Sequence, residues 1–170
     1  MKSIYLSSVF VAMVSLSSCK TIAIALINPL GKDGVTGQVK FVQERNGKVY
    51  MTTVINGSKS GVRAMHIHEK GDCSTPDGTS AGGHWNPLNH KHGKWGKDEF
   101  HKGDIGNVWM NVQGKGFYGL VTDKWCVGCP DVTKNIVGKA IIVHEKVDNF
   151  ITQPTGAAGS RKGCGVIRIK

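Results

Sequence analysis

Five of the seven histidines of this chain lie in two short stretches, MHIHEKGDC and HWNPLNHKHG, and the other two follow in HKGD and IIVHEK. In chain order they are His66, His68, His84, His90, His92, His101 and His144. Imidazole nitrogen binds copper and zinc, and a carboxylate such as Asp104 suits zinc better than copper. Histidines concentrated in this way predict a metal centre rather than independent solvated side chains.

The spacing of the first pair predicts how it is presented. His66 and His68 stand two apart in a predicted strand, so both side chains leave the same face. Met65 and Ile67 then point the opposite way and can fill a core. His144, at the end of another predicted strand, can supply a third nitrogen. A long loop and its far edge add four more candidates, which are His84, His92, His101 and Asp104. An all-histidine copper site beside a histidine and aspartate zinc site is therefore chemically sensible.

The segments that must position these side chains alternate with period two, which is typical of half-buried strands. In VTGQVKFV and KVYMTTVI the predicted inward residues are Val35, Val39 and Phe41, and Val49, Met51, Thr53 and Ile55. Asn46-Gly47 between the two runs indicates a hairpin turn. Further strands are predicted at 21–28, 61–68, 105–113, 115–122, 136–144 and 164–169. Eight short strands without a convincing long helix predict an all-β antiparallel sandwich or barrel.

Two predicted connections are much longer than the others, at about 69–104 and 145–163. Structureless loops of this length are uncommon in a compact domain unless they are functional. The histidines lie in the first loop and at the strand ends that border both loops, so a metal centre would account for the length of these loops.

The composition fits one globular domain, with 39% hydrophobic and 20% charged residues among 170. The formal net charge of +10 admits an anionic partner, but the basic residues are dispersed and form no run of five or six. A nucleic-acid or membrane-surface module would also leave the histidines unexplained. We therefore expect no nucleic-acid partner, and a small anion is the better candidate.

The first residues predict export. MKSIYLSSVFVAMVSLSSC has a lysine, an apolar stretch of about a dozen residues and then small residues, which is typical of a secretory signal peptide. Its end, Leu16 to Cys19, resembles a bacterial lipobox. That resemblance implies a signal peptide at 1–18, cleavage before Cys19, lipidation of Cys19, and a mature domain at 19–170. An ordinary secretory signal is the alternative.

The number of cysteines agrees with export to an oxidising compartment. There are five, so four can pair and Cys19 can be the one left over. Cys126 and Cys129 form a CxxC motif in a predicted loop, and such a pair can be a small structural disulfide, a thiolate site for copper(I) or zinc, or a redox couple. No βαβ pattern surrounds the motif, so a thioredoxin-like redox role is not expected. The small disulfide is the preferred interpretation.

Five motifs make the sequence recognisable: HIHEKGDC, SAGGHWNPLNHKHG, HKGDIGN, IIVHEKVD and GAAGSRKGCGVI. Together and in this order they resemble the copper,zinc superoxide dismutase family, and the HWNP form and the export signal resemble its bacterial secreted or lipoprotein type. The resemblance implies an eight-stranded antiparallel Greek-key β-sandwich or barrel, immunoglobulin-like, with two long functional loops. It also implies disproportionation of superoxide to oxygen and hydrogen peroxide, as a defence against extracytoplasmic superoxide.

The resemblance assigns roles to particular residues. It implies copper ligands at His66, His68, His84 and His144, and zinc ligands at His84, His92, His101 and Asp104, with His84 serving both metals. His90 falls outside the pattern and is expected to face solvent, although a swap with His92 stays open from sequence. Asp148 would link ligands of the two metals, Arg161 would guide the anion, and Cys73 and Cys164 would form the family disulfide. Lys146 can add to the local positive field, and Lys162 is expected to be a solvated surface charge.

Two departures leave questions open. The second long loop lacks the lysine- and glutamate-bearing insert of the family's animal members, so electrostatic steering of the substrate is expected to be built differently or to be weaker. The CxxC motif favours an alternative function, a metal carrier that kept the fold and lost turnover. A missing copper ligand or arginine would mark such a carrier, and neither is missing.

The expected surroundings of the protein follow from these predictions. The cofactors are copper and zinc, and the small-molecule partner is superoxide. The expected location is the cell envelope, in the periplasm or at the outer membrane as a lipoprotein, or otherwise the outside of the cell as a secreted protein. Membrane contact is expected only through the N-terminal lipid, and a homodimer is left open.

Overall fold

Nine strands carry nearly all the regular structure of residues 20–57 and 59–170, the part of the chain that the computed structural model describes. They are β1 (Thr21–Pro29), β2 (Thr36–Gln43), β3 (Val49–Asn56), β4 (Gly61–His68), β5 (Gly106–Met110), β6 (Lys115–Thr122), β7 (Ala140–His144), β8 (Arg161–Val166) and β9 (Arg168–Ile169). A three-residue 3-10 turn, η1 (Thr79–Ala81), is the one helical element within the described ranges. The predicted signal peptide at 1–18 and the predicted lipidation site Cys19 lie outside them.

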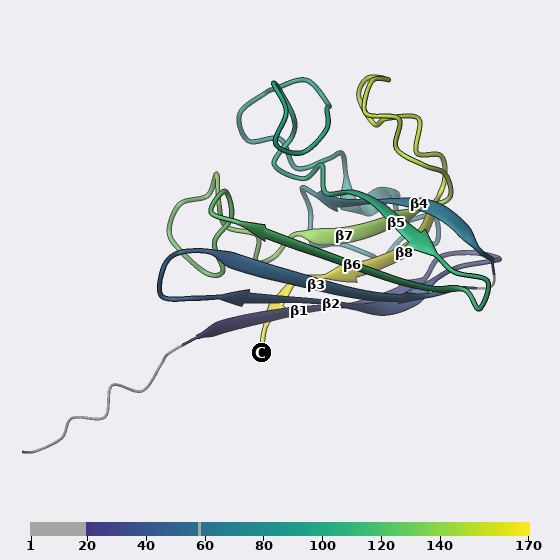
Figure 1. Ribbon diagram of the computed structural model, residues 1–170, viewed down its shortest axis with the longest axis horizontal. Coiled ribbons are helices and arrows are strands. Elements are labelled where there is room, and N and C mark those ends of the chain that lie inside the picture. Colours follow the sequence, from purple (N-terminus) through teal and green to yellow (C-terminus); the bar gives the residue numbers. More distant parts are fainter. Residues whose placement is uncertain (1–19, 58) are drawn as a thin grey trace, which may run out of the picture.

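The strands close into a barrel. Their order is β2-β3-β6-β5-β4-β7-β8-β1, all neighbours are antiparallel, and β1 pairs with both β8 and β2. β9 adds a short pairing to β1. The neighbours β3 and β6, β4 and β7, and β1 and β8 are far apart in sequence, which is the Greek-key arrangement (Figure 1). The predicted all-β, eight-stranded antiparallel fold is confirmed, in its closed-barrel form.

The alternation predicted for the first hairpin is confirmed. β3 alternates strictly between buried and exposed residues, and all seven predicted inward residues of β2, β3 and the turn before them are at most 2% exposed. The two strands pair from Thr36–Asn56 to Gln43–Val49, and Gly47 makes the turn with a φ of 79°. The core between the barrel walls is therefore the one that period two predicts.

Three strand ends differ from the prediction for local reasons. β5 ends at Met110 because the Asn111 side chain accepts hydrogen bonds from the backbone N–H groups of Gln113 and Lys115 and closes a turn. β7 begins at Ala140, not at 136, because the chain turns at Gly138, whose φ is 79°. β8 begins three residues earlier than predicted, at Arg161.

The middle of one barrel wall is buried on both faces. β7 and the last six residues of β4 are buried, because the two long connections cover their outer face. Both connections rise on the same side of the barrel (Figure 1). They are joined where Gln153 accepts a hydrogen bond from the backbone N–H of His92 and donates one to its carbonyl, both at 2.9 Å. The outer face of β4 thus becomes an enclosed space between a rigid wall and two loops.

No helix within residues 20–57 and 59–170 is long and apolar enough to cross a lipid bilayer.

Candidate metal centre

The enclosed space holds a first group of four histidines. His66 and His68 leave the outer face of β4, while Met65 and Ile67 fill the core. β7 lies beside β4 and brings His144 to them, and a backbone bridge places His84 against His68. The imidazole centroids of His66 and His84 are 4.0 Å apart, and those of His66 and His144 are 5.0 Å apart.

A second group shares His84 and is arranged around one carboxylate. Asp104 Oδ1 lies 2.8 Å from His84 Nδ1, 3.0 Å from His92 Nδ1 and 3.2 Å from His101 Nδ1. Asp104 Oδ2 accepts hydrogen bonds from the backbone N–H groups of His101 and Gly93. Its position is therefore set by the loop backbone, and three imidazoles converge on it.

The loop reaches this place because it extends the barrel wall. The backbone N–H of Trp85 donates to Ile67 O, and Ile67 N–H donates to Gly103 O, so the two ends of the loop lie against β4. Trp85 is buried in the core, which anchors the residue next to His84. His84 and Asp104 therefore each stand next to a residue, Trp85 or Gly103, whose backbone is hydrogen-bonded to Ile67 of β4.

The donor atoms fit metal ions. In each group the four candidate ligand atoms all lie within 4.8 Å of one another, and all seven side chains are buried. His66 Nδ1, His84 Nε2 and His92 Nδ1 are buried without a hydrogen-bond partner, although the last lies close to Asp104 without being aligned with it. Buried polar atoms normally have partners, so atoms left without one at a convergence of imidazoles suit a cation. Four nitrogens suit copper, and three nitrogens with one carboxylate oxygen suit zinc.

The nitrogens that face away from each centre have partners that fix the rings. Asp148 lies 2.8 Å from His66 Nε2 and 2.9 Å from His92 Nε2, so one carboxylate joins the two groups. Its own oxygen Oδ1 also accepts the backbone N–H of Phe150. Hydrogen bonds of this kind orient metal-binding imidazoles and set which nitrogen is free to bind.

Two backbone carbonyls do the same beside the first group, and no side chain in the sequence predicts them. His68 Nδ1 lies 2.9 Å from Gly82 O, and His144 Nδ1 lies 3.3 Å from Gly159 O. Both carbonyls belong to the long loops. A carbonyl carries no side-chain signal, and the glycines before a turn were the one available hint.

The first group is neutral near pH 7. Burial lowers the pKa of His66, and it lowers the pKa values of His68 and His144 well below the ordinary value. Burial also lowers the pKa of His84 to about 4, against the opposing effect of its hydrogen bond to Asp104. Neutral imidazoles keep the lone pair that a metal needs.

The second group holds a proton. Burial acts to lower the pKa of His92, but the hydrogen bonds and charges of Asp104 and Asp148 outweigh it and raise that pKa to about 9. Burial acts in the opposite sense on Asp104, and hydrogen bonds from His101, His84 and His92 hold the pKa of this carboxyl far below its usual range. A divalent cation can replace the proton among the same atoms, so binding at this group releases a proton.

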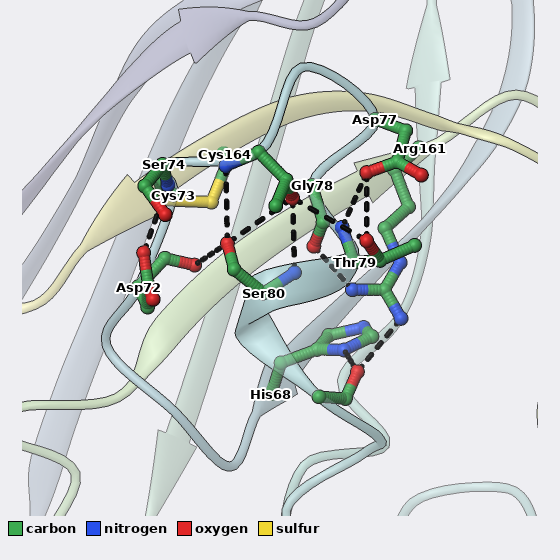
Figure 2. The surroundings of a disulfide bond; sticks show 12 residues. His68, Asp72, Cys73, Ser74, Asp77, Gly78, Thr79, Ser80, Arg161 and Cys164 are labelled. Atoms are coloured by element: carbon green, nitrogen blue, oxygen red, sulfur yellow. Dashed lines mark hydrogen bonds between the residues drawn. A yellow bond between two sulfur atoms is a disulfide. The ribbon is translucent and has the colours of Figure 1, made fainter.

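A guanidinium stands beside the first group. Arg161 opens β8, and its Nη1 and Nη2 donate to the carbonyls of Gly78 and Gly82 at 2.5 and 2.7 Å (Figure 2). The Gly82 carbonyl is the one that also contacts His68. Burial lowers the pKa of Arg161, which stays cationic near neutral pH. The Gly82 carbonyl thus lies between His68 and the Arg161 guanidinium. A positive charge fixed this close to the imidazoles can attract and orient a small anion.

A disulfide holds the loop that carries these carbonyls. Cys73 and Cys164 are bonded across 91 residues, which ties the first long loop to β8 (Figure 2). The loop from Asp72 into η1 is further closed by Ser80 Oγ, which donates to Asp72 O, and by Asp77, which accepts hydrogen bonds from the Thr79 backbone and hydroxyl. Arg161 therefore depends on a loop segment that is fixed at both ends.

The remaining predicted residues also have definite places. His90 is exposed and belongs to neither group; its carbonyl and N–H are held by the Asn86 side chain. The swap with His92 that the sequence left open does not occur. Cys126 and Cys129 form a disulfide in the loop 123–139. Lys146 and Lys162 are not part of either group.

Comparison with known proteins gives a consistent set of relatives. A family model described as copper/zinc superoxide dismutase (SODC) matches residues 35–167. Superoxide dismutase [Cu-Zn] 3 of Arabidopsis thaliana is 36% identical over 87% of this chain and 90% of its own length. Superoxide dismutase [Cu-Zn] 5 of Dictyostelium discoideum is 37% identical over 81% of this chain and 92% of its own. The crystal structure of the clock protein EA4 superposes with a TM-score of 0.77 at 34% identity, over 88% of this chain and 94% of that one.

Proposed function

The chain belongs to the copper/zinc superoxide dismutase family, and we propose how its own residues divide the work of that activity. The protein is a superoxide dismutase, an oxidoreductase that converts superoxide to oxygen and hydrogen peroxide with copper and zinc as cofactors. The observation that carries the proposal is the pair of buried ligand groups that share His84.

The two groups differ in donor chemistry, which supports one metal for each. The all-nitrogen group would hold copper, through His66, His68, His84 and His144. The group with the carboxylate would hold zinc, through His84, His92, His101 and Asp104. Asp148 positions the rings of both groups by its contacts to His66 and His92.

The chemistry that bound copper supplies is one-electron exchange, with an electron accepted from one superoxide and passed to the next. The protein supplies position, charge and protons. His84 has its Nδ1 beside Asp104 and its Nε2 free toward the first group. Nε2 is therefore the atom at which this chain would hold one of the two protons that hydrogen peroxide requires, and solvent supplies the other. The buried imidazoles around it exclude bulk water.

Arg161 would bind the substrate anion. Its guanidinium is held by two carbonyls and is partly exposed, so it meets an incoming anion in one orientation. Lys146 lies near the start of the loop that carries Gly159 and close to that glycine, where its positive charge supports the same attraction. The shorter second loop leaves fewer charges to steer with than the insert of the family's animal members provides.

The test of the copper assignment is His66→Ala. This change removes a ligand from the first group only, so we expect superoxide dismutation to be abolished while zinc stays bound. His90→Ala, at an exposed histidine outside both groups, is the matched control and should leave activity and both metals unchanged. Retained superoxide dismutation in the His66→Ala variant would rule out the assignment of copper to the first group. Full binding of both metals by the parent protein without turnover would favour the metal carrier instead.

We further propose that the protein is exported and lipid-anchored at Cys19, in the cell envelope or, without the lipid, outside the cell. The charge, apolar and small-residue pattern of residues 1–19 supports it. The four cysteines of the described residues pair with each other, which leaves Cys19 as the odd one. The relatives compared come from a plant and an amoeba, so the bacterial type rests on these residues and on the HWNP form of the His84 motif. Metabolic labelling with a fatty acid should mark the parent protein and not Cys19→Ala.

We propose a homodimer through a row of exposed apolar side chains on one face of the barrel. Val54 pairs with Phe117, Val62 pairs with Trp109, and Trp109 and Phe117 flank the paired Met110 and Gly116. This row is apolar across β3, β6, β5 and β4 and is 41% to 68% exposed. Two copies with a formal charge of +10 repel each other elsewhere, and a two-fold interface sets the same row against itself. Trp109→Glu should lower the sedimentation coefficient from dimer to monomer; an unchanged value would exclude this interface.

A further inference from the structure

A second cleft lies at one end of the barrel. It measures about 210 Å³ and is lined by Asp33, Lys59, Ser60, Val62, Arg63, Glu145 and Lys162. These residues come from the turn between β1 and β2, the approach and start of β4, the end of β7 and the start of β8. None of them is a member of the two metal-ligand groups.

The cleft contains a buried guanidinium with few partners. Arg63 shares the inward face of β4 with Met65 and Ile67 and is only 6% exposed. Its one hydrogen bond to any described residue runs from Nη1 to the carbonyl of Glu145, at 3.3 Å. Its nitrogens are not among the buried atoms sealed without a partner, and the residue lines the cleft, so the cleft is where its remaining N–H groups can meet an anion. A guanidinium has five N–H donors, and burying a cation without an anion is costly.

The carboxylates near Arg63 are engaged elsewhere. Asp33 is paired with Lys59 at 3.0 Å, and the Glu145 carboxylate accepts the Ser160 hydroxyl at 2.7 Å. Neither lies within ion-pair distance of Arg63 among the described residues; the pKa of Glu145 is lowered chiefly by its hydrogen bond from Ser160, and the charge of Arg63 is only a minor cause. Three cations and two carboxylates line the cleft, which leaves it one positive charge in excess. Lys162, which the sequence predicted to be a solvated surface charge, is one of the three.

We propose that this cleft binds a small oxyanion of the phosphate or sulfate class, with Arg63 as its principal contact. A guanidinium fork matches two oxygens of such an anion, and Lys59 and Lys162 supply point charges around it. The oxygens of the anion would accept hydrogen bonds from the N–H groups of Arg63 that have no acceptor in the protein. The site is separate from the substrate position, because Arg161 is turned to the carbonyls of Gly78 and Gly82. The proposal does not depend on the metals.

The test is calorimetric titration of the metal-loaded protein with inorganic phosphate, at constant ionic strength set with chloride. We expect Arg63→Met to weaken phosphate binding by at least about tenfold, and Arg63→Lys and Lys162→Met to weaken it less. Lys48→Met is the charge-matched control, because exposed Lys48 lies at the opposite end of the β2 and β3 hairpin. Arg161→Ser should retain the cleft site and so separates it from an anion held beside the metal centre.

The outcomes distinguish the proposal from its rivals. Phosphate binding that is weakened in the Arg63 and Lys162 variants, most in Arg63→Met, and unchanged in the Lys48 and Arg161 variants supports it. No phosphate binding by the parent protein overturns it, and so does complete loss in Arg161→Ser with none in Arg63→Lys. Should Arg63→Met fail to fold, the Arg63→Lys and Lys162→Met variants still decide the question.

Discussion

Two loops of this protein each contain a disulfide, yet they are held in place by different means. The loop between β4 and β5, residues 69–105, is fixed by contacts to distant parts of the chain. The loop between β6 and β7, residues 123–139, is fixed mostly by its own side chains. The first contributes four candidate metal ligands, and the second contributes none.

The first loop leaves buried atoms without partners. His84 Nε2 and His92 Nδ1 have no hydrogen bond, and Asp104 is fully buried among imidazoles. The disulfide of this loop joins it to β8, and Arg161 at the start of β8 donates a hydrogen bond to the Gly78 carbonyl of the loop. An arrangement of this kind is incomplete without a cation, so the order of the loop and the metal are coupled.

The second loop is held mostly by hydrogen bonds among its own residues, with a few contacts to the rest of the barrel. The Asn135 amide accepts from the backbone N–H groups of Gly128 and Val137 and donates to the Cys129 carbonyl. Asp131 accepts from the backbone and hydroxyl of Thr133. Trp125 is buried in the core and donates its indole N–H to Lys102 O. The disulfide adds one more tie to a loop that already has its conformation.

The largest expected effect comes from removing the carboxylate on which the first loop converges. Asp104→Ala deletes a candidate zinc ligand and leaves two backbone N–H groups without an acceptor. We expect zinc affinity to fall by more than the about 10- to 100-fold cost of losing a partner outside the ligand shell. Hydrogen exchange should accelerate in residues 84–104 and stay unchanged in 123–139. Equal acceleration of hydrogen exchange in both loops would contradict the conclusion that only the first loop depends on the metal. Asp98→Ala, at an exposed aspartate of the same loop, is the control.

The next effect concerns the long-range disulfide. Cys73→Ser opens a loop closed across 91 residues, which lowers the free energy of unfolding by up to about 4 to 5 kcal/mol on a chain-entropy argument. Denaturant unfolding measures it. Turnover should fall as well, because the Gly78 and Gly82 carbonyls that hold Arg161 lose their tie to β8. Cys164→Ser should match it in stability; a marked difference between the two would point to effects other than the lost bond.

The barrel was predictable from the sequence because its signal is local. Period two fixes which face of β2 and β3 is buried, and it places His66 and His68 together without any knowledge of the rest. The sets of ligands needed the family motifs, because nothing in the spacing of His84 or His144 says which strands become neighbours. The carbonyls of Gly82 and Gly159 and the buried position of Arg63 were not predictable, since each depends on contacts between segments about 14 to 82 residues apart. The predicted end of β5 was wrong because the Asn111 side chain closes a turn there, which period two does not reveal.

A smaller effect is expected at the guanidinium that the first loop positions. Arg161→Lys keeps the positive charge but loses the pair of hydrogen bonds to the Gly78 and Gly82 carbonyls, and Arg161→Ser loses both the charge and the hydrogen bonds. We expect kcat/KM to fall by about tenfold in the serine variant and by less in the lysine variant, with copper and zinc contents unchanged. The dependence of kcat/KM on salt should weaken in the serine variant. An unchanged salt dependence would mean that other charges steer the anion.

The smallest effect should come from the second disulfide, and it tests the comparison most directly. Cys126→Ser opens a loop across only three residues, so the chain-entropy argument gives at most about 2 kcal/mol. Superoxide turnover and the hydrogen exchange of residues 123–139 should be unchanged, because Asn135 still holds the turn. Asn135→Ala removes three hydrogen bonds, at about 0.5 to 1.5 kcal/mol each, and should destabilise the protein more than Cys126→Ser does. The reverse ranking would show that the disulfide shapes this loop. Copper(I) bound by the reduced parent protein and lost in Cys126→Ser would instead give the cysteine pair the metal-capturing role that its spacing also allows.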